Sequence, residues 1–166
     1  MQILDIQQQN SHWESKVLAP ATLSTKRKLF STISAQLSMR YVLSIQGLRR
    51  TGKSVLMRQL VDELTAKEEI KPSQILFFSF DLEDEQDLLP SSELKELLNI
   101  YFLQILKIHP QKISSRVIIA LDEIQNVANW QGIIKSYFDL NENIKFLITG
   151  SSSLFLSKSS ESYMKP

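Results

Sequence analysis

Apolar residues along this chain fall into two repeating patterns, short unbroken runs and longer stretches with helical spacing. The unbroken runs predict strands that are buried on both faces of a sheet, and they cover Tyr41 to Gln46, Gln74 to Leu82, Arg116 to Gln125 and Asn143 to Ser153. The helically spaced stretches predict amphipathic helices, and they cover Ser24 to Leu37, Lys53 to Lys67, Ser91 to Lys107 and Trp130 to Leu140. Because strands and helices alternate, we expect an α/β fold with an open parallel sheet and helices on both faces.

The first and last residues depart from this alternation. Residues 1–24 are polar and rich in Gln, and they include the pair Ala19-Pro20, which is a poor start for a packed element, so we expect an N-terminal arm laid on something else. The core is expected over residues 25–156. Residues 157–166 end a Ser-rich stretch, which we interpret as a tail or as the start of a missing C-terminal part.

Length, charge and composition narrow the possible classes of protein. At 166 residues the chain is long enough for one domain with a core. Its formal net charge of +1, with scattered basic residues, does not indicate a nucleic-acid partner or a membrane surface. The absence of cysteine excludes disulfides and thiolate metal sites. The chain starts without a signal-peptide pattern and contains no apolar run long enough to cross a bilayer, so we expect a cytoplasmic protein.

The segment GLRRTGKS, Gly47 to Ser54, combines the residues needed to hold the phosphates of a nucleotide. Gly47 ends a predicted strand, and Gly52 permits backbone conformations that turn successive N–H groups inward. The helix that begins near Lys53 directs its positive dipole end toward an anion. Lys53 would reach the β- and γ-phosphates, and the Ser54 hydroxyl would be one ligand of Mg²⁺. We therefore expect a nucleotide-binding loop made of Gly47, Leu48, Arg49, Arg50, Thr51, Gly52, Lys53, Ser54 and Val55.

Alternatives remain open for this loop. The segment is also compatible with a plain turn in which Ser54 caps the following helix and no ligand binds. Arg49 and Arg50 are placed to contact a γ-phosphate or the ligand of a neighbouring subunit. Loop arginines usually point into solvent, however, and we favour that interpretation for both.

A second motif lies at the end of the third predicted strand, where VIIALD is followed by Glu123. Ligands in open α/β folds bind at the carboxyl ends of the strands. We expect Asp122 to hold Mg²⁺, through water or through Ser54, and Glu123 to polarise the attacking water. The alternative is that Glu123, and less readily Asp122, is a solvated carboxylate of an ordinary turn with no role at a site.

Other chemically active residues carry no predicted function. His12 and His109 are far apart in the sequence and have no acid or thiol at useful spacing. The acidic run from Asp81 to Asp87 matches no metal-ligand pattern and is interpreted as a solvated loop.

Together, GLRRTGKSVLMRQL, ALDEIQNVANWQ and FLITGSSS resemble the ATPase module of prokaryotic AAA-type proteins, a P-loop class with a catalytic glutamate after the Mg²⁺ aspartate. The resemblance covers residues 25–156 and implies ATP as the nucleotide. It also implies that the strands ending at Asp122 and Thr149 lie beside the phosphate-loop strand. Ser151 or Ser152 would take the place of the polar sensor that touches the γ-phosphate or the attacking water, although a plain Ser-rich turn explains these residues equally well.

The chain departs from that family after residue 156. The resembling proteins continue with a fifth strand beside the phosphate-loop strand, then a helical lid and a separate C-terminal domain. We therefore expect a truncated N-terminal fragment in which Tyr41 to Gln46 is an uncovered sheet edge that favours self-association. An arginine finger, which can contribute about 10³ to 10⁵ in rate, would come from the missing part or from a neighbouring copy.

These motifs predict an ATP-binding protein that uses Mg²⁺ and hydrolyses the β–γ bond. Lys53 and Glu123 are the expected catalytic residues, and Ser54 and Asp122 are the expected metal ligands. Hydrolysis by this chain alone is expected to be slow. Two alternatives stay open, a nucleotide-binding switch with little turnover and a remnant that binds no nucleotide.

Overall fold

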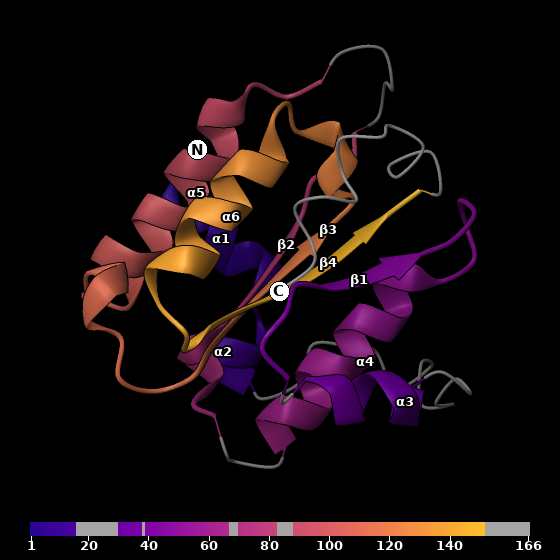
Figure 1. Ribbon diagram of the computed structural model, residues 1–166, viewed down its shortest axis with the longest axis horizontal. Coiled ribbons are helices and arrows are strands. Elements are labelled where there is room, and N and C mark those ends of the chain that lie inside the picture. Colours follow the sequence, from indigo (N-terminus) through magenta and orange to yellow (C-terminus); the bar gives the residue numbers. More distant parts are fainter. Residues whose placement is uncertain (16–29, 38, 67–69, 83–87, 152–166) are drawn as a thin grey trace.

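A computed structural model describes residues 1–15, 30–37, 39–66, 70–82 and 88–151, and its centre is a four-stranded parallel sheet (Figure 1). The three strand pairings are all parallel. Across the sheet the strand order is β1-β4-β3-β2. The four apolar runs therefore form the predicted strands, which are β1 (Leu43–Gln46), β2 (Ile75–Ser79), β3 (Val117–Asp122) and β4 (Ile144–Gly150).

The strand order places β4 between β1 and β3. We expected both β3 and β4 beside the phosphate-loop strand. In the part of the chain that the structure describes, β1 pairs directly with β4, and β3 lies one strand further away. Within the described residues, β1 pairs on one side only and forms an edge of the sheet. Leu43 and Ile45 of this strand are nevertheless buried, because they pack into one of two hydrophobic cores.

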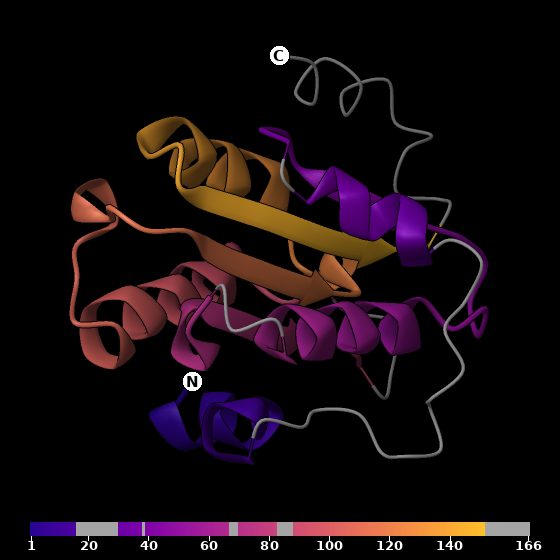
Figure 2. The same ribbon diagram turned by 90° about the horizontal axis from the view of Figure 1, so that it is seen from below.

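Helices cover both faces of the sheet, which confirms the expected α/β architecture (Figure 2). On one face, α4 (Lys53–Ala66) packs across β2, β3 and β4, and α3 (Phe30–Gln36) packs against α4. On the other face, α6 (Trp130–Leu140) packs on β4 and contacts α5 (Ser91–Asn99). The helix expected from Ser24 is described only from Phe30 onward.

Successive residues of β3 point into the two separate cores. Ile118 and Ala120 belong to the core beneath α3 and α4, whereas Ile119 and Leu121 belong to the core beneath α5 and α6. Full burial of one large aliphatic side chain contributes about 1.5–3 kcal/mol. The two cores therefore fix β3 from both sides and hold its carboxyl end in place.

Short helical segments complete the described chain. The 3-10 turns are η2 (Pro72–Gln74), η4 (Pro110–Lys112) and η5 (Ile124–Asn126). α5 continues into the π-helical segment η3 (Ile100–Ile105), and the Leu106 N–H donates to the Tyr101 carbonyl at 2.9 Å. In the described part of the chain, no helix has the length and apolar character required to cross a membrane.

The first fifteen residues form two short packed helices, whereas we expected an arm laid on another part of the molecule. They form α1 (Ile3–Gln9) and α2 (His12–Ser15), and α1 contacts β2. Ile6 is fully buried in the same core as α5. Helices this short are unstable by themselves, so tertiary contacts rather than local pattern determine them. The expected boundary at residue 24 lies outside the described residues and stays a prediction.

Polar side chains of this N-terminal segment bond to the outer edge of β2. An open strand edge presents backbone N–H and C=O groups without partners, which favours association with other chains. Here those groups receive side-chain hydrogen bonds at 2.7–2.9 Å, and the bonded pairs are Gln9 with Ser79, Asn10 with Phe77, and His12 and Trp13 with Ile75. The polar side chains of this segment therefore cover the outer edge of β2, although their pattern in the sequence predicts an arm.

Candidate functional site

The carboxyl ends of β1, β3 and β4 meet at one edge of the sheet, because all strands run in the same direction (Figure 1). β1 is followed there by the phosphate loop, residues 47–54. In the sheet register, Gln46 lies beside Gly150 and Leu121 lies beside Ile148. This is the edge at which open α/β sheets bind their ligands.

The phosphate loop depends on its glycines for its shape. Gly52 has a φ of 83°, in the left-handed region that glycine adopts without strain. An added Cβ at Gly47 would lie 3.1 Å from Thr51 Oγ1, so a larger residue would displace that side chain. Thr51 Oγ1 donates to the Leu48 carbonyl at 2.7 Å and closes the turn. Gly47 and Gly52 thus stand at the two loop positions where the motif GLRRTGKS predicts a need for glycine.

The first turn of α4 presents backbone N–H groups that have no partner inside the helix. The first helical bond runs from the Leu56 N–H to the Gly52 carbonyl at 3.1 Å. The N–H groups from Gly52 to Val55 therefore precede the helical ladder. A helix of 14 residues also carries a partial positive charge at this end. Both features favour an anion at the loop.

Lys53 is buried at the base of the loop, with 6% of its surface exposed. Its Nζ donates to the Leu48 carbonyl at 3.1 Å and lies 3.5 Å from Glu123 Oε1. A buried ammonium group requires negative partners. The structure thus brings together the lysine and the glutamate that the sequence assigns to one site.

Asp122, at the end of β3, is also buried, with 2% of its surface exposed. Its Oδ1 accepts a hydrogen bond from the Thr149 hydroxyl, and its Oδ2 accepts one from the Ser79 hydroxyl at 3.4 Å. A carboxylate oxygen can accept two hydrogen bonds or bind a metal in addition to one. Both oxygens of Asp122 therefore retain capacity for a further partner.

Glu123 follows Asp122 and turns the chain out of the strand with a φ of 51°. Its N–H donates to the Thr149 hydroxyl at 3.0 Å, and its Oε2 accepts a hydrogen bond from the Gln125 side-chain amide. The Glu123 side chain is 18% exposed, compared with 5% for the Lys53 side chain, and reaches the outer part of the site. Thr149 consequently contacts both acidic residues at once.

Sequence reasoning missed Thr149 and Gln125 as parts of this site. We expected a polar group at Ser151 or Ser152, whereas the hydroxyl that contacts Asp122 and the Glu123 backbone comes from within β4. A threonine in an apolar run is typical of an ordinary strand. One signal could have identified Thr149: its hydroxyl lies near the end of a strand that is predicted to be buried, and a buried hydroxyl must find a polar partner.

The remaining loop residues are more exposed. Leu48, Arg49, Arg50 and Thr51 lie on the surface, and Ser54 and Val55 are half-buried. Arg49 nevertheless lines a cavity of about 60 Å³ together with Glu123, Gln125 and Ser151. Ser152 lies outside the described residues.

The donor atoms at this edge fit a magnesium ion that arrives with a nucleotide. The described residues include no group of three or more His, Cys, Asp or Glu side chains that would hold a metal ion by themselves. Mg²⁺ bound to nucleotide phosphates needs few protein ligands, because phosphate and water oxygens complete its octahedron. Asp122 offers a carboxylate with spare acceptor capacity, and Ser54 lies in the first turn of α4.

Comparison with known proteins identifies the family. A family model described as "AAA domain" matches residues 39–165, which is more than half of the chain. The chain belongs to this AAA-domain family. The match includes the phosphate loop and both acidic residues at the end of β3, so the AAA domain is a nucleotide-binding, ATPase-like module of the P-loop type.

Two uncharacterised proteins are similar in sequence to this AAA domain. One, from Methanocaldococcus jannaschii, is 30% identical over 118 residues, which is 71% of this chain and 23% of that protein. The other, from Haemophilus influenzae, is 29% identical over 117 residues, which is 70% of this chain and 27% of that protein. The match thus spans about a quarter of each relative. The solved structure of C. elegans PCH-2 is similar over 94% of this chain and 44% of that chain, with 15% identity and a TM-score of 0.49.

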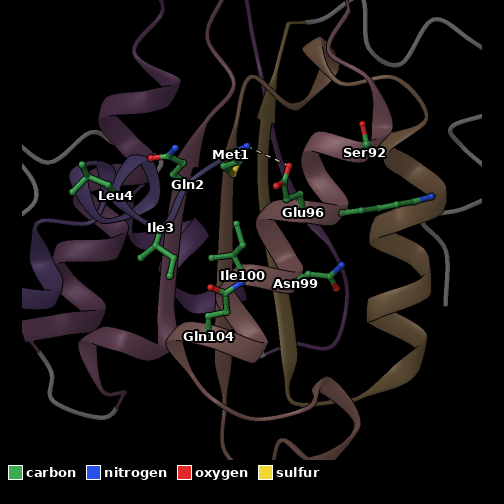
Figure 3. A pocket seen from close by; sticks show the side chains of 10 residues that line it. Met1, Gln2, Ile3, Leu4, Ser92, Glu96, Asn99, Ile100 and Gln104 are labelled. Carbon is green, nitrogen blue, oxygen red and sulfur yellow. Dashed lines mark hydrogen bonds and ion pairs between the residues drawn. The ribbon is translucent and has the colours of Figure 1, made fainter.

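The AAA domain also has a separate hollow between α1 and α5 (Figure 3). Its volume is about 790 Å³, and the Met1 ammonium pairs with Glu96 at 3.3 Å in its wall. The wall includes neither the phosphate loop nor Asp122 or Glu123. This hollow is larger than the cavity beside Glu123, but the buried charges and the N-terminus of α4 lie at the carboxyl edge of the sheet, and we place the candidate site there.

Proposed function

We propose that this AAA domain binds Mg-ATP at the phosphate loop and hydrolyses its β–γ bond. The observation that carries the proposal is the buried Lys53 ammonium in the first turn of α4, 3.5 Å from the Glu123 carboxylate. An ammonium at the N-terminus of a helix attracts a polyanion. The Glu123 carboxylate, 3.5 Å from this ammonium, would then lie close to the terminal phosphate of the bound polyanion.

The loop backbone and Lys53 would hold the phosphates. The N–H groups from Gly52 to Val55 donate to phosphate oxygens, and Lys53 exchanges the Leu48 carbonyl and Glu123 for the more highly charged β- and γ-phosphates. Arg49 and Ser151 line the same small cavity as Glu123. We assign both to contacts near the γ-phosphate.

Ser54 and Asp122 would hold the magnesium ion, the serine directly and the aspartate through water. When bound, Mg²⁺ neutralises charge on the β- and γ-phosphates. Thr149 and Ser79 keep the Asp122 carboxylate in a fixed orientation through their hydroxyl groups. Asp122 therefore presents its oxygens without needing to reorganise.

Glu123 would accept a proton from the attacking water. The water oxygen forms a bond to the γ-phosphorus while the bond between that phosphorus and the bridging oxygen breaks, and ADP leaves with the electron pair. The proton then passes from Glu123 to the phosphate product, so that ATP and water give ADP and phosphate. Once Lys53 has turned to the phosphates, Glu123 Oε1 is available as the acceptor.

Further parts of the machinery are proposed to come from other residues or chains. The chain matches about a quarter of the length of its two relatives. An arginine finger from another segment or from a second copy would add about 10³ to 10⁵ in rate. Among the described residues β1 pairs on one side only, and we propose that its other side is an edge at which another strand pairs. We therefore expect slow hydrolysis by this chain alone.

Hydrolysis by the variant Glu123→Gln tests this proposal. With protein in excess over labelled ATP, the wild type should release phosphate in a Mg²⁺-dependent reaction, and Glu123→Gln should be slower by about 10² or more while still binding ATP. Glu142→Gln, an exposed acidic position before β4, is the matched control and should change neither property. Equal rates with intact binding would indicate a switch instead, and no binding by the wild type would contradict the whole proposal.

A further inference from the structure

Gln125 is the side chain that holds the second oxygen of Glu123. Its Nε2 donates to Glu123 Oε2. The orientation of the amide follows from this contact, because the opposite orientation would place the amide oxygen against a carboxylate oxygen. Gln125 lies in η5, the turn that directly follows the proposed proton acceptor.

The Glu123 side chain is therefore held at both of its oxygens. Oε1 lies 3.5 Å from Lys53 Nζ, and Oε2 receives the Gln125 amide. The Glu123 backbone is fixed separately, since its N–H donates to Thr149 Oγ1 at 3.0 Å. Of these contacts, the one with Lys53 must break when Lys53 turns to phosphate. The Gln125 contact is the one that can persist on the carboxylate during the reaction.

The turn itself does not need the Gln125 amide. η5 is closed by backbone bonds from Asn126 N–H to the Glu123 carbonyl at 3.1 Å and from Val127 N–H to the Ile124 carbonyl at 3.0 Å. The Asn126 side chain also donates to the Phe80 carbonyl at 2.9 Å, and Ile124 is fully buried. A side chain of similar length without polar atoms would leave these contacts in place.

The other end of the amide also argues against a structural purpose. Gln125 Oε1 is buried and has no hydrogen-bond partner among the described residues. A buried acceptor without a partner is unfavourable for stability. The amide is thus satisfied only where it contacts Glu123, at the wall of the small cavity that both residues share.

From these contacts we infer that Gln125 is a positioning residue for hydrolysis: it keeps the Glu123 carboxylate aimed at the attacking water after Lys53 has moved to the phosphates. The inference rests on the proposed function. It predicts an effect on the chemical step and none on nucleotide binding, because Gln125 acts through Glu123 and holds no phosphate. A misplaced catalytic group lowers the rate strongly while the ligand still binds.

The variant Gln125→Met tests the inference, since methionine has a similar length and no amide. At saturating Mg-ATP, single-turnover hydrolysis should fall about 10- to 100-fold, with the Kd for ATP within about twofold of wild type. In a Glu123→Gln background, the same change should cause no further loss, because the group it positions is already absent. Gln111→Met, at an exposed glutamine, is the matched control and should behave as wild type.

The outcomes separate this inference from the proposed function. If wild type hydrolyses ATP, Glu123→Gln does not, and Gln125→Met keeps the wild-type rate, the inference alone is wrong. It is also wrong if Gln125→Met weakens ATP binding in parallel with the rate. Failure of both Gln125→Met and Gln125→Leu to fold would assign Gln125 a structural role. If the wild type releases no phosphate from ATP, the proposed function fails, and the inference fails with it.

Discussion

The Lys53 ammonium and the Glu123 carboxylate face each other at 3.5 Å between the phosphate loop and the end of β3. One of these groups is proposed to bind phosphate and the other to activate water, and without a nucleotide each neutralises the other. Nucleotide binding must separate the two groups, because the Lys53 ammonium cannot pair fully with the Glu123 carboxylate and with the phosphates at the same time. The pair therefore links occupation of the loop to release of the carboxylate.

Replacing Glu123 with glutamine should strengthen the binding of ATP. The change removes a negative charge that competes for Lys53 and repels the phosphates. In a partly shielded site this effect amounts to about 1 kcal/mol, or about a fivefold lower Kd. Titration calorimetry at fixed ionic strength measures it, with Glu142→Gln as the control. Weaker binding by Glu123→Gln would show that the ion pair does not oppose the nucleotide.

Replacing Thr149 with valine should weaken both the fold and the reaction. Valine keeps the branched shape but removes the donor to Asp122 and the acceptor for the Glu123 N–H. Loss of a hydrogen bond to a charged group costs about 1.5–3 kcal/mol of unfolding free energy. Urea unfolding measures this loss, and phosphate release should also slow.

Thr149→Ser is the matched control, because it retains the hydroxyl. It should keep most of the stability and turnover that Thr149→Val loses. If the two variants behave alike in both measurements, the methyl packing of Thr149 matters and its hydroxyl does not.

The buried ring of His12 should make the stability of the protein depend on pH. Burial lowers the pKa of His12 from 6.5 to about 4, although the bond to the Ile75 carbonyl acts in the opposite direction. The unfolded chain therefore takes up a proton at a higher pH than the folded chain does. The stabilisation is present above pH 6.5 and is lost as the pH falls toward 4.

This loss is measurable by urea unfolding at a series of pH values. One pKa unit corresponds to about 1.4 kcal/mol, so wild type should lose about 3 kcal/mol more than His12→Gln between neutral pH and pH 4. His109→Gln replaces an exposed histidine and serves as the control. Parallel curves for wild type and His12→Gln would show that His12 is not the group responsible.

The core of the fold and the centre of the site are readable from the sequence for physical reasons. A parallel strand covered on both faces must be almost wholly apolar, so the four runs identify the sheet. The phosphate loop needs glycine at positions such as Gly52, whose φ of 83° strains other residues. Asp122 ends a buried strand and Glu123 follows it, and the direction of that strand determines the edge at which they lie.

Other features depend on contacts between distant segments and carry no local pattern. Asn10 and His12 belong to a polar stretch, yet both are buried because they bond to the edge of β2. Thr149 resembles an ordinary strand residue until the sheet brings it to Asp122. The contact of Lys53 with Glu123 likewise exists only after β1 and β3 have been assembled around β4.

Binding of Mg-ATP by wild type and by Lys53→Ala is the most direct measurement of the central claim, that the phosphate loop is a nucleotide site. Wild type with ATP at 100 times its Kd should gain about 2.7 kcal/mol of unfolding free energy and melt at a higher temperature. Lys53→Ala should still fold but show little or no shift at the same ATP concentration, whereas Lys135→Ala, at an exposed lysine of α6, should match wild type. No ATP-dependent shift in wild type, or an equal shift in Lys53→Ala, would contradict the account.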